Sequence, residues 1–221
     1  MKHDKLLQAF VAYLVVVYSK RFWLGDLNGL QFWLADVLCF VVIPVVLMAW
    51  SFRPVFPFKE FQKKMPHERT VGYGTLAFYA VICFLALIAV HRCSLIVAAK
   101  VMNSYPDVLP QKLSYTSKLP GGGELKFIAA LYFGLTAGIV EEFLFRGVLK
   151  KLLGDYISKS NLVFVVLSAV IFGTIHWAAG LSSIVATGMA GLLLAMLYLW
   201  TKDLRPLMAG HFLLDFFIYL R

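Results

Sequence analysis

Long apolar stretches recur along this chain, separated by short segments rich in Lys, Arg, Pro and Gly. About 20 apolar residues in an α-helix are enough to cross the hydrocarbon core of a bilayer. The pattern is not the series of short alternating segments that is typical of a membrane β-barrel. We therefore predict an all-α fold, a polytopic transmembrane bundle of about seven or eight helices. The predicted segments are Leu6–Leu24, Leu30–Trp50, Val71–Val101, Leu125–Leu153, Leu162–Ala179, Ser182–Trp200 and Pro206–Leu220.

The composition supports a membrane protein. Hydrophobic residues make up 61% of the chain and charged residues 15%, whereas soluble domains have about 45–50% and about 25%. The net charge of +9 does not indicate a nucleic-acid partner, because Lys and Arg gather between the apolar runs. Cys39, Cys83 and Cys93 lie in or beside apolar segments without metal-ligand spacing, so we assign them to packing.

The distribution of Lys and Arg also predicts an orientation. Residues Arg53–Arg69 form the most basic loop, which the positive-inside rule places in the cytoplasm. Alternation then puts Lys150–Lys159 and Lys202–Arg205 on the same side, and Asn103–Gly123 on the other. The first segment, Leu6–Leu24, contains "SKRFW" and either spans the membrane or lies at its interface.

Ionisable side chains within apolar segments are costly to bury and are candidate functional groups. In the stretch "EEFLFR", Glu142 and Arg146 are four residues apart and share a helix face. Glu141 points about 100° away from its neighbour. We therefore pair Glu142 with Arg146 and leave Glu141 facing the interior, where it could accept a proton from water.

Two further clusters lie in later segments, so that all three fall in the C-terminal half. In "FGTIHW", His176 is near the end of the fifth segment, and Phe172 lies one turn before it. In "HFLLDF", His211 and Asp215 are four apart and face the same way, so the carboxylate can orient the imidazole.

Each cluster alone also has a purely structural interpretation. These are a structural ion pair for "EEFLFR", an interfacial residue for His176, and a hydrogen-bonded pair between helices for His211 and Asp215. Together the three clusters would bring a carboxylate base, two imidazoles and a cation to one interior site. Such a set can activate water, stabilise an oxyanion and protonate a leaving amine.

"EEFLFR", "FGTIH" and "HFLLD", in this order, resemble the motifs of the CPBP intramembrane proteases. This family includes the CAAX prenyl endopeptidases and bacterial relatives linked to bacteriocin self-immunity or protein sorting. The resemblance implies a prokaryotic glutamate-type peptidase that cuts near the C-terminus of a membrane-associated substrate. The resemblance covers about residues 125–220, so we divide the single membrane unit into N-terminal segments with a basic loop over 1–124 and a catalytic helical core over 125–221.

The resemblance assigns a role to each motif residue. Glu141 would activate the water with His176 beside it, and Glu142 and Arg146 would position that pair. Phe172 would pack against the site. His211 and Asp215 would bind the oxyanion.

One position departs from the family, which often has Asn where this chain has Asp215. An ionised Asp cannot donate a hydrogen bond to an oxyanion. Either Asp215 is protonated or it orients His211, and we therefore assign the oxyanion to His211.

The remaining expectations concern cofactors, partners and competing functions. We expect no cofactor; two Glu and two His are possible zinc ligands, but there is no HExxH motif. The expected partners are a membrane-anchored protein or peptide substrate and the lipid bilayer, and the expected location is the inner cell membrane, with multiple passes. The alternatives are a non-catalytic immunity or chaperone-like factor and a proton-coupled transporter; the sequence has no inverted repeat to favour the latter.

Overall fold

The computed structural model describes the whole chain except residues 1, 25–26, 28, 53–71, 105–122 and 158–159. The predicted basic loop, Arg53–Arg69, and most of Asn103–Gly123 lie outside the described residues. The described residues contain helices and no strands, which confirms the all-α prediction. The α-helices are α1 (Lys2–Leu24), α2 (Gly29–Val37), α3 (Ile43–Phe52), α5 (Tyr73–Ser104), α6 (Gly123–Leu135), α7 (Leu149–Tyr156), α8 (Asn161–Thr174), α9 (Leu181–Thr201) and α10 (Arg205–Leu220).

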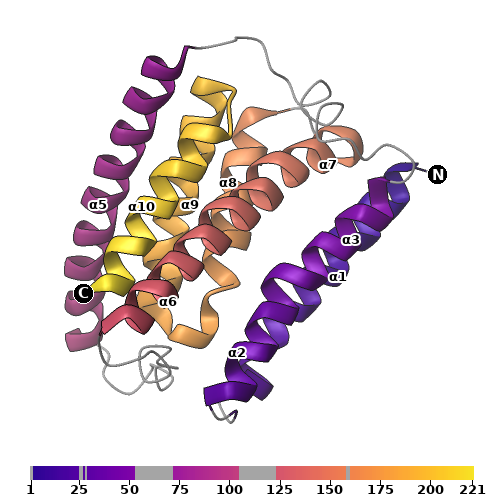
Figure 1. The fold of residues 1–221 in the computed structure, drawn as a ribbon. Coiled ribbons are helices and arrows are strands. Elements are labelled where there is room, and N and C mark those ends of the chain that lie inside the picture. The colour runs from indigo at the N-terminus through magenta and orange to yellow at the C-terminus, as the bar shows by residue number, and fades with distance from the viewer. Residues whose placement is uncertain (1, 25–26, 28, 53–71, 105–122, 158–159) are drawn as a thin grey trace.

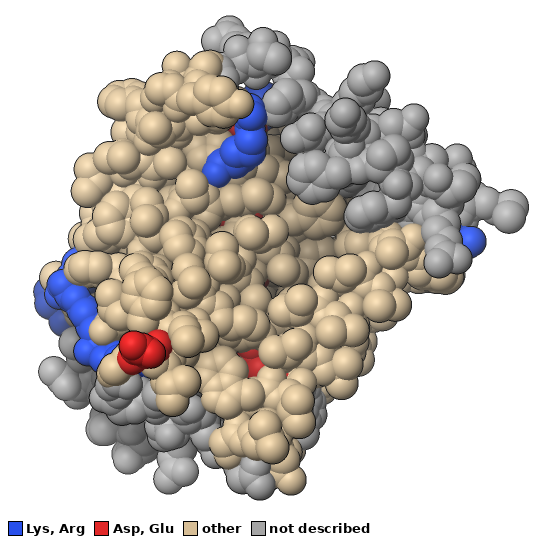
Figure 2. Space-filling model, viewed as in Figure 1, with Lys and Arg blue, Asp and Glu red and all other residues tan. Residues whose placement is uncertain are grey.

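The helices run up and down beside one another. Figure 1 shows the pair α1 and α3 on one side, α5 on the opposite side, and the remaining long helices between them. Helix α10 packs against both α5 and α6, and α9 packs against α8. The described part of the face in Figure 2 is largely uncharged, with Lys and Arg at its sides and near its top and a few Asp or Glu atoms lower down, as expected of a surface that mostly meets lipid.

Four helical stretches are long and apolar enough to cross a membrane. The other predicted segments also form helices, but α1, α8 and α10 are outside this set, which was sought among the described residues alone. The four are Gly29–Ser51, Tyr73–Val97, Gly123–Asp155 and Leu181–Thr201.

Helix α8 is shorter than the predicted segment Leu162–Ala179. It ends at Thr174, and a short 3-10 turn, η6 (Trp177–Ala179), leads into α9. Its 14 residues span roughly 21 Å, less than the roughly 30 Å of a bilayer core. The chain therefore turns back early, and Gly180, with a φ of 91°, makes that turn possible.

Three stretches of π-helix widen the helical rods. The first, η1 (Leu38–Val42), precedes Pro44, and the N–H of Ile43 bonds to the carbonyl of Leu38, five residues back. Pro44 supplies the cause, because it has no N–H and its ring displaces the preceding turn. The others, η4 (Thr136–Glu141) and η5 (Phe143–Val148), carry the "EEFLFR" motif. Turns of this kind are frequent at functional sites.

Glycine lets α10 approach the motif closely. A Cβ added to Gly138, in η4, would lie 2.6 Å from the backbone oxygen of Met208 and 2.9 Å from the backbone nitrogen of Phe212. Such contacts are too short for any other residue. Gly138 therefore sets the distance between the segment that carries Glu142 and the helix that carries His211.

Candidate active site

A cavity of about 340 Å³ lies within the bundle and is bordered by side chains from both halves of the chain. Five of the residues predicted from sequence line it: Glu141, Phe172, His176, His211 and Asp215. Glu142 and Arg146 do not line it; they are fully buried behind its wall. The three motifs therefore meet at one place, as expected.

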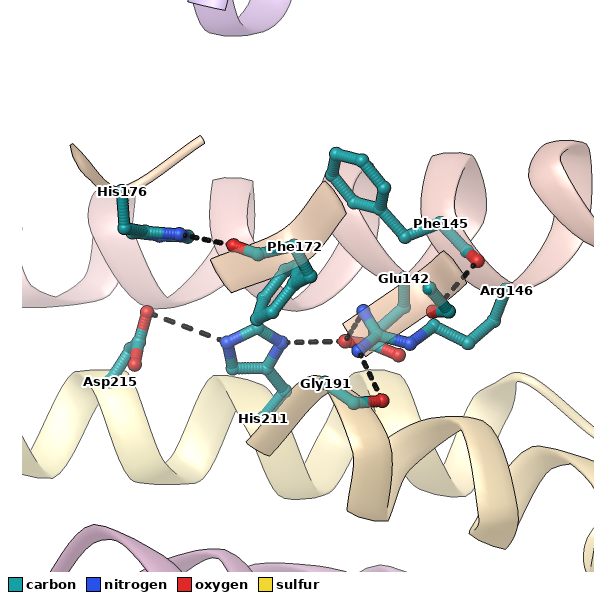
Figure 3. Close-up of polar contacts among 9 residues, drawn as sticks. Glu142, Phe145, Arg146, Phe172, His176, Gly191, His211 and Asp215 are labelled. Carbon is teal, nitrogen blue, oxygen red and sulfur yellow. Dashed lines mark hydrogen bonds and ion pairs between the residues drawn. The ribbon is translucent and has the colours of Figure 1, made fainter. Parts of the chain in front are cut away.

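Behind the cavity wall, Glu142 connects two helices. Its Oε1 accepts a hydrogen bond from Nη1 of Arg146 at 3.0 Å, the ion pair expected from their spacing. The same oxygen lies 2.8 Å from Nδ1 of His211 on α10. A carboxylate paired with Arg146 can only accept, so Nδ1–H of His211 is the donor. The other ring nitrogen of His211 points toward Asp215 (Figure 3), and both residues line the cavity.

Arg146 is held by contacts from further elements. Its Nη2 donates to the carbonyl of Gly191 on α9 at 3.3 Å. Its guanidinium carbon lies 4.4 Å from the ring centroid of Phe172 on α8, a cation–π contact. The buried guanidinium of Arg146, on η5, thus contacts both α8 and α9 beside the site.

Phe172 lies between the two imidazoles, as Figure 3 shows. Its ring centroid is 5.2 Å from that of His176 and 6.0 Å from that of His211. Phe145 closes the other side with an edge-on contact at 5.4 Å. This packing fixes the planes of both imidazole rings.

His176 lies in the turn after α8, where the short helix brings it to the cavity. Its Nδ1 is 2.8 Å from the carbonyl oxygen of Phe172. A carbonyl can only accept, so Nδ1 carries the proton. In the neutral ring the Nε2 lone pair is then available as an acceptor.

Two contacts differ from expectation. Glu142 binds His211, and Arg146 binds Glu142, whereas the family resemblance implied that Glu142 and Arg146 position Glu141 and His176. In addition, Nε2 of His211 is 3.8 Å from Oδ2 of Asp215, too far for a hydrogen bond. The carboxylate that orients His211 is therefore Glu142, on another helix, and not Asp215 four residues away.

The three sequence clusters did not include ionisable residues of the N-terminal half that also border the cavity. Lys20 on α1, Asp36 on α2 and His91 on α5 also line the cavity. Asp36 accepts a hydrogen bond from the hydroxyl of Tyr132 at 2.7 Å. Asp36 could have been found from sequence, because it is an ionisable residue inside a predicted membrane segment.

Within the part of the chain that the structure describes, no three His, Cys, Asp or Glu residues are arranged to hold a metal ion. Nδ1 of His176 and Nδ1 of His211 are both bound to protein oxygens. These contacts orient the two rings independently of any ion.

Comparison with protein families gives one match. Residues 123–217 match the family described as Rce1-like, type II CAAX prenyl endopeptidase. The chain is similar to this family over that region. It contains all the site residues named above from the three motifs, and the resemblance inferred from those motifs is thereby confirmed. No curated protein and no solved structure matched the chain.

The Rce1-like match identifies the kind of protein at a coarse level. The match and the four apolar helices support a membrane protein whose C-terminal part is similar to the CAAX-type intramembrane endopeptidases, a family of peptidases. Its substrates are accordingly expected in or at the bilayer.

Proposed function

We propose that this chain is a glutamate-type intramembrane endopeptidase that hydrolyses a peptide bond near the C-terminus of a membrane-associated protein or peptide. The observation that carries the proposal is that Glu141, His176 and His211, from three separate elements, line one cavity. A cavity of about 340 Å³ is within the usual range for a ligand site.

Water activation is assigned to Glu141 and His176. Nε2 of His176 accepts a hydrogen bond from the water, since its Nδ1–H is held by the carbonyl of Phe172. Glu141 takes the water's proton as the oxygen attacks the peptide carbonyl. The same proton then passes to the leaving nitrogen as the C–N bond breaks, so the carboxylate is regenerated.

Stabilisation of the oxyanion is assigned to His211. When doubly protonated, its ring has a carboxylate oxygen near each nitrogen, Glu142 at 2.8 Å and Asp215 at 3.8 Å. Nε2–H can then donate to the oxyanion that forms in the cavity. Glu142 and Arg146 are positioning residues, because they act through His211 and do not reach the cavity.

The proposed chemistry uses the side chains alone, without a resident metal. Each step above has a protein group for each proton and each developing charge. A zinc-dependent mechanism makes the opposite prediction, that a chelator removes the activity and added zinc restores it.

The test uses purified protein in detergent micelles and a quenched fluorescent peptide that ends in S-farnesylated Cys-Val-Leu-Ser. We expect cleavage by the wild type, and loss of cleavage in Glu141→Gln and His176→Ala. Glu124→Gln is the matched control, because Glu124 lies exposed at the start of the same helical rod. Each assay is repeated with a chelator, which we expect to have no effect.

Two results would overturn the proposal. Cleavage at the wild-type rate by Glu141→Gln would remove the assigned base. Equal loss in Glu141→Gln and Glu124→Gln would show a general effect of removing charge from this rod.

A further inference from the structure

Lys20, on α1, lies outside the family match and is not used by the proposed mechanism. Its side chain lines the cavity and is 7% exposed. Among the described cavity-lining residues it is the one Lys or Arg. Its Nζ lies 5.6 Å from the ring centroid of Phe40, which also lines the cavity. A cation is thus presented inside an apolar bundle, close to the reacting groups.

The position of Lys20 relative to His176 is set by two hydrogen bonds that flank that histidine. The hydroxyl of Tyr18 lies 2.6 Å from Oγ1 of Thr174. The indole N–H of Trp177 donates to the carbonyl of Tyr18 at 3.1 Å. Because α1 is bound on both sides of His176, Lys20, two residues beyond Tyr18, is held at the same end of the cavity.

The charge of the cavity makes this cation significant. Its lining includes the carboxylates Glu141, Asp36 and Asp215, which would repel an anion. An anionic group can enter a site of low polarity at acceptable cost only where a cation and hydrogen-bond donors meet it. The ammonium group has three donors, so it can hold an incoming anion as well as a neighbour.

A peptide that is cut near its C-terminus must bring its terminal carboxylate into or next to this cavity. We propose that Lys20 binds the C-terminal carboxylate of the peptide substrate. This assignment rests on the proposed function, and it gives an N-terminal helix a part in substrate recognition. It makes the free carboxylate, and not only the sequence before it, a determinant of specificity.

The test separates binding from cleavage. A fluorescein-labelled peptide ending in S-farnesylated Cys-Val-Leu-Ser is prepared as the free acid and as the C-terminal amide. Binding to protein in detergent micelles is measured by fluorescence anisotropy, and cleavage is measured in parallel. The proteins compared are the wild type, Lys20→Met, Lys20→Arg and the control Lys5→Met, which alters an exposed residue of the same helix.

We expect the wild type to bind the acid about 10- to 100-fold more tightly than the amide, the range for a hydrogen bond between charged groups. Lys20→Met should bind the acid as weakly as the amide, with affinity for the amide unchanged. Lys20→Arg should keep most of the preference, and Lys5→Met all of it. Thermal unfolding midpoints of the variants serve as the check on folding.

The inference is overturned if the wild type binds both peptides equally, or binds neither, or if Lys20→Met weakens both by the same factor. The last result would make Lys20 a structural counter-charge for Asp36 and Glu141. Cleavage without a preference for the acid would remove this inference and leave the proposed function standing. A preference for the acid without cleavage would remove the proposed function and leave carboxylate binding by Lys20 standing.

Discussion

At the scale of single residues, the buried pair of Glu142 and Arg146 is an expensive feature. Both side chains have no exposed surface, and Oε2 of Glu142 and Nε of Arg146 have no hydrogen-bond partner among the described residues. A buried pair with unmet bonds is often no more stable than apolar residues of similar volume. Stability therefore does not explain why the chain buries this pair. The hydrogen bond between Glu142 and His211, which orients the imidazole, does explain it.

This view predicts a difference between breaking the pair and replacing it. Glu142→Leu leaves Arg146 as a buried charge without its partner, and we expect it to lower the free energy of unfolding by about 3–5 kcal/mol. Glu142→Leu combined with Arg146→Met should be less destabilised than Glu142→Leu alone. Unfolding in detergent, followed by circular dichroism, measures both.

Cleavage assays of the two variants test whether the pair positions His211 or has only a structural role. Both should cleave slowly, because His211 loses the oxygen that holds its Nδ1–H. A double variant with normal stability and normal cleavage would contradict the positioning role.

Asp215 offers a second prediction at this scale. Its carboxylate borders the cavity but does not hydrogen-bond to His211. Asp215→Asn would add an N–H donor facing the cavity and remove a negative charge from beside the oxyanion. We expect kcat to rise, by less than the roughly 100-fold that one oxyanion donor contributes in other enzymes.

Asp215→Ala is the matched control, since it removes the charge without adding a donor. Steady-state kinetics on the quenched peptide compare the two. A kcat for Asp215→Asn at or below the wild-type value would mean that the carboxylate itself takes part in the reaction.

At the scale of elements, the periodicity of apolar residues predicted where helices form but not how they deviate. Each predicted segment corresponds to a helical rod. The early end of α8 could not be read from "FGTIHW", because Ile175, Trp177 and Ala178 continue the apolar run past Thr174. The contact between Glu142 and His211 was also hidden, since it joins residues 69 positions apart on segments whose packing no local pattern encodes.

The close approach of η4 and α10 gives a prediction for these elements. In Gly138→Ala, the new Cβ would meet backbone atoms of Met208 and Phe212 at under 3 Å, so the two helices must separate. We expect lower thermal stability and a large loss of cleavage, because the separation pulls His211 away from Glu142. Overpacking of this kind costs about 1–3 kcal/mol.

Gly154→Ala is the matched control in the same helical rod. Nothing lies within 4 Å of a Cβ at Gly154, and Ala is favoured over Gly in a helix by about 1 kcal/mol. This variant should be as stable as the wild type or more so, with normal cleavage. Equal effects of the two substitutions would contradict the argument from close packing.

At the scale of the whole molecule, the two halves of the chain share one cavity. Tyr13 and Lys20 of α1 and Asp36 of α2 border it together with the motif residues of the Rce1-like region. Sequence motifs indicated the proposed reacting groups, but nothing in the spacing of Lys20 or Asp36 indicated that they lie near those groups. The N-terminal helices thus complete the site, and their contribution became visible only in three dimensions.

The distribution of Lys and Arg predicts how the whole molecule is oriented in the membrane. The rod from Gly123 to Asp155 has 33 residues and spans about 50 Å, so its two ends reach opposite sides of a bilayer. In a background with Cys93→Ser, which removes the exposed native thiol, Lys151→Cys and Glu124→Cys each place one thiol near one end.

Because basic residues are retained in the cytoplasm, a membrane-impermeant maleimide should label Glu124→Cys in intact cells. It should label Lys151→Cys only after the membrane is permeabilised. The reverse pattern would invert the orientation, and labelling of both in intact cells would mean that the rod does not cross the membrane.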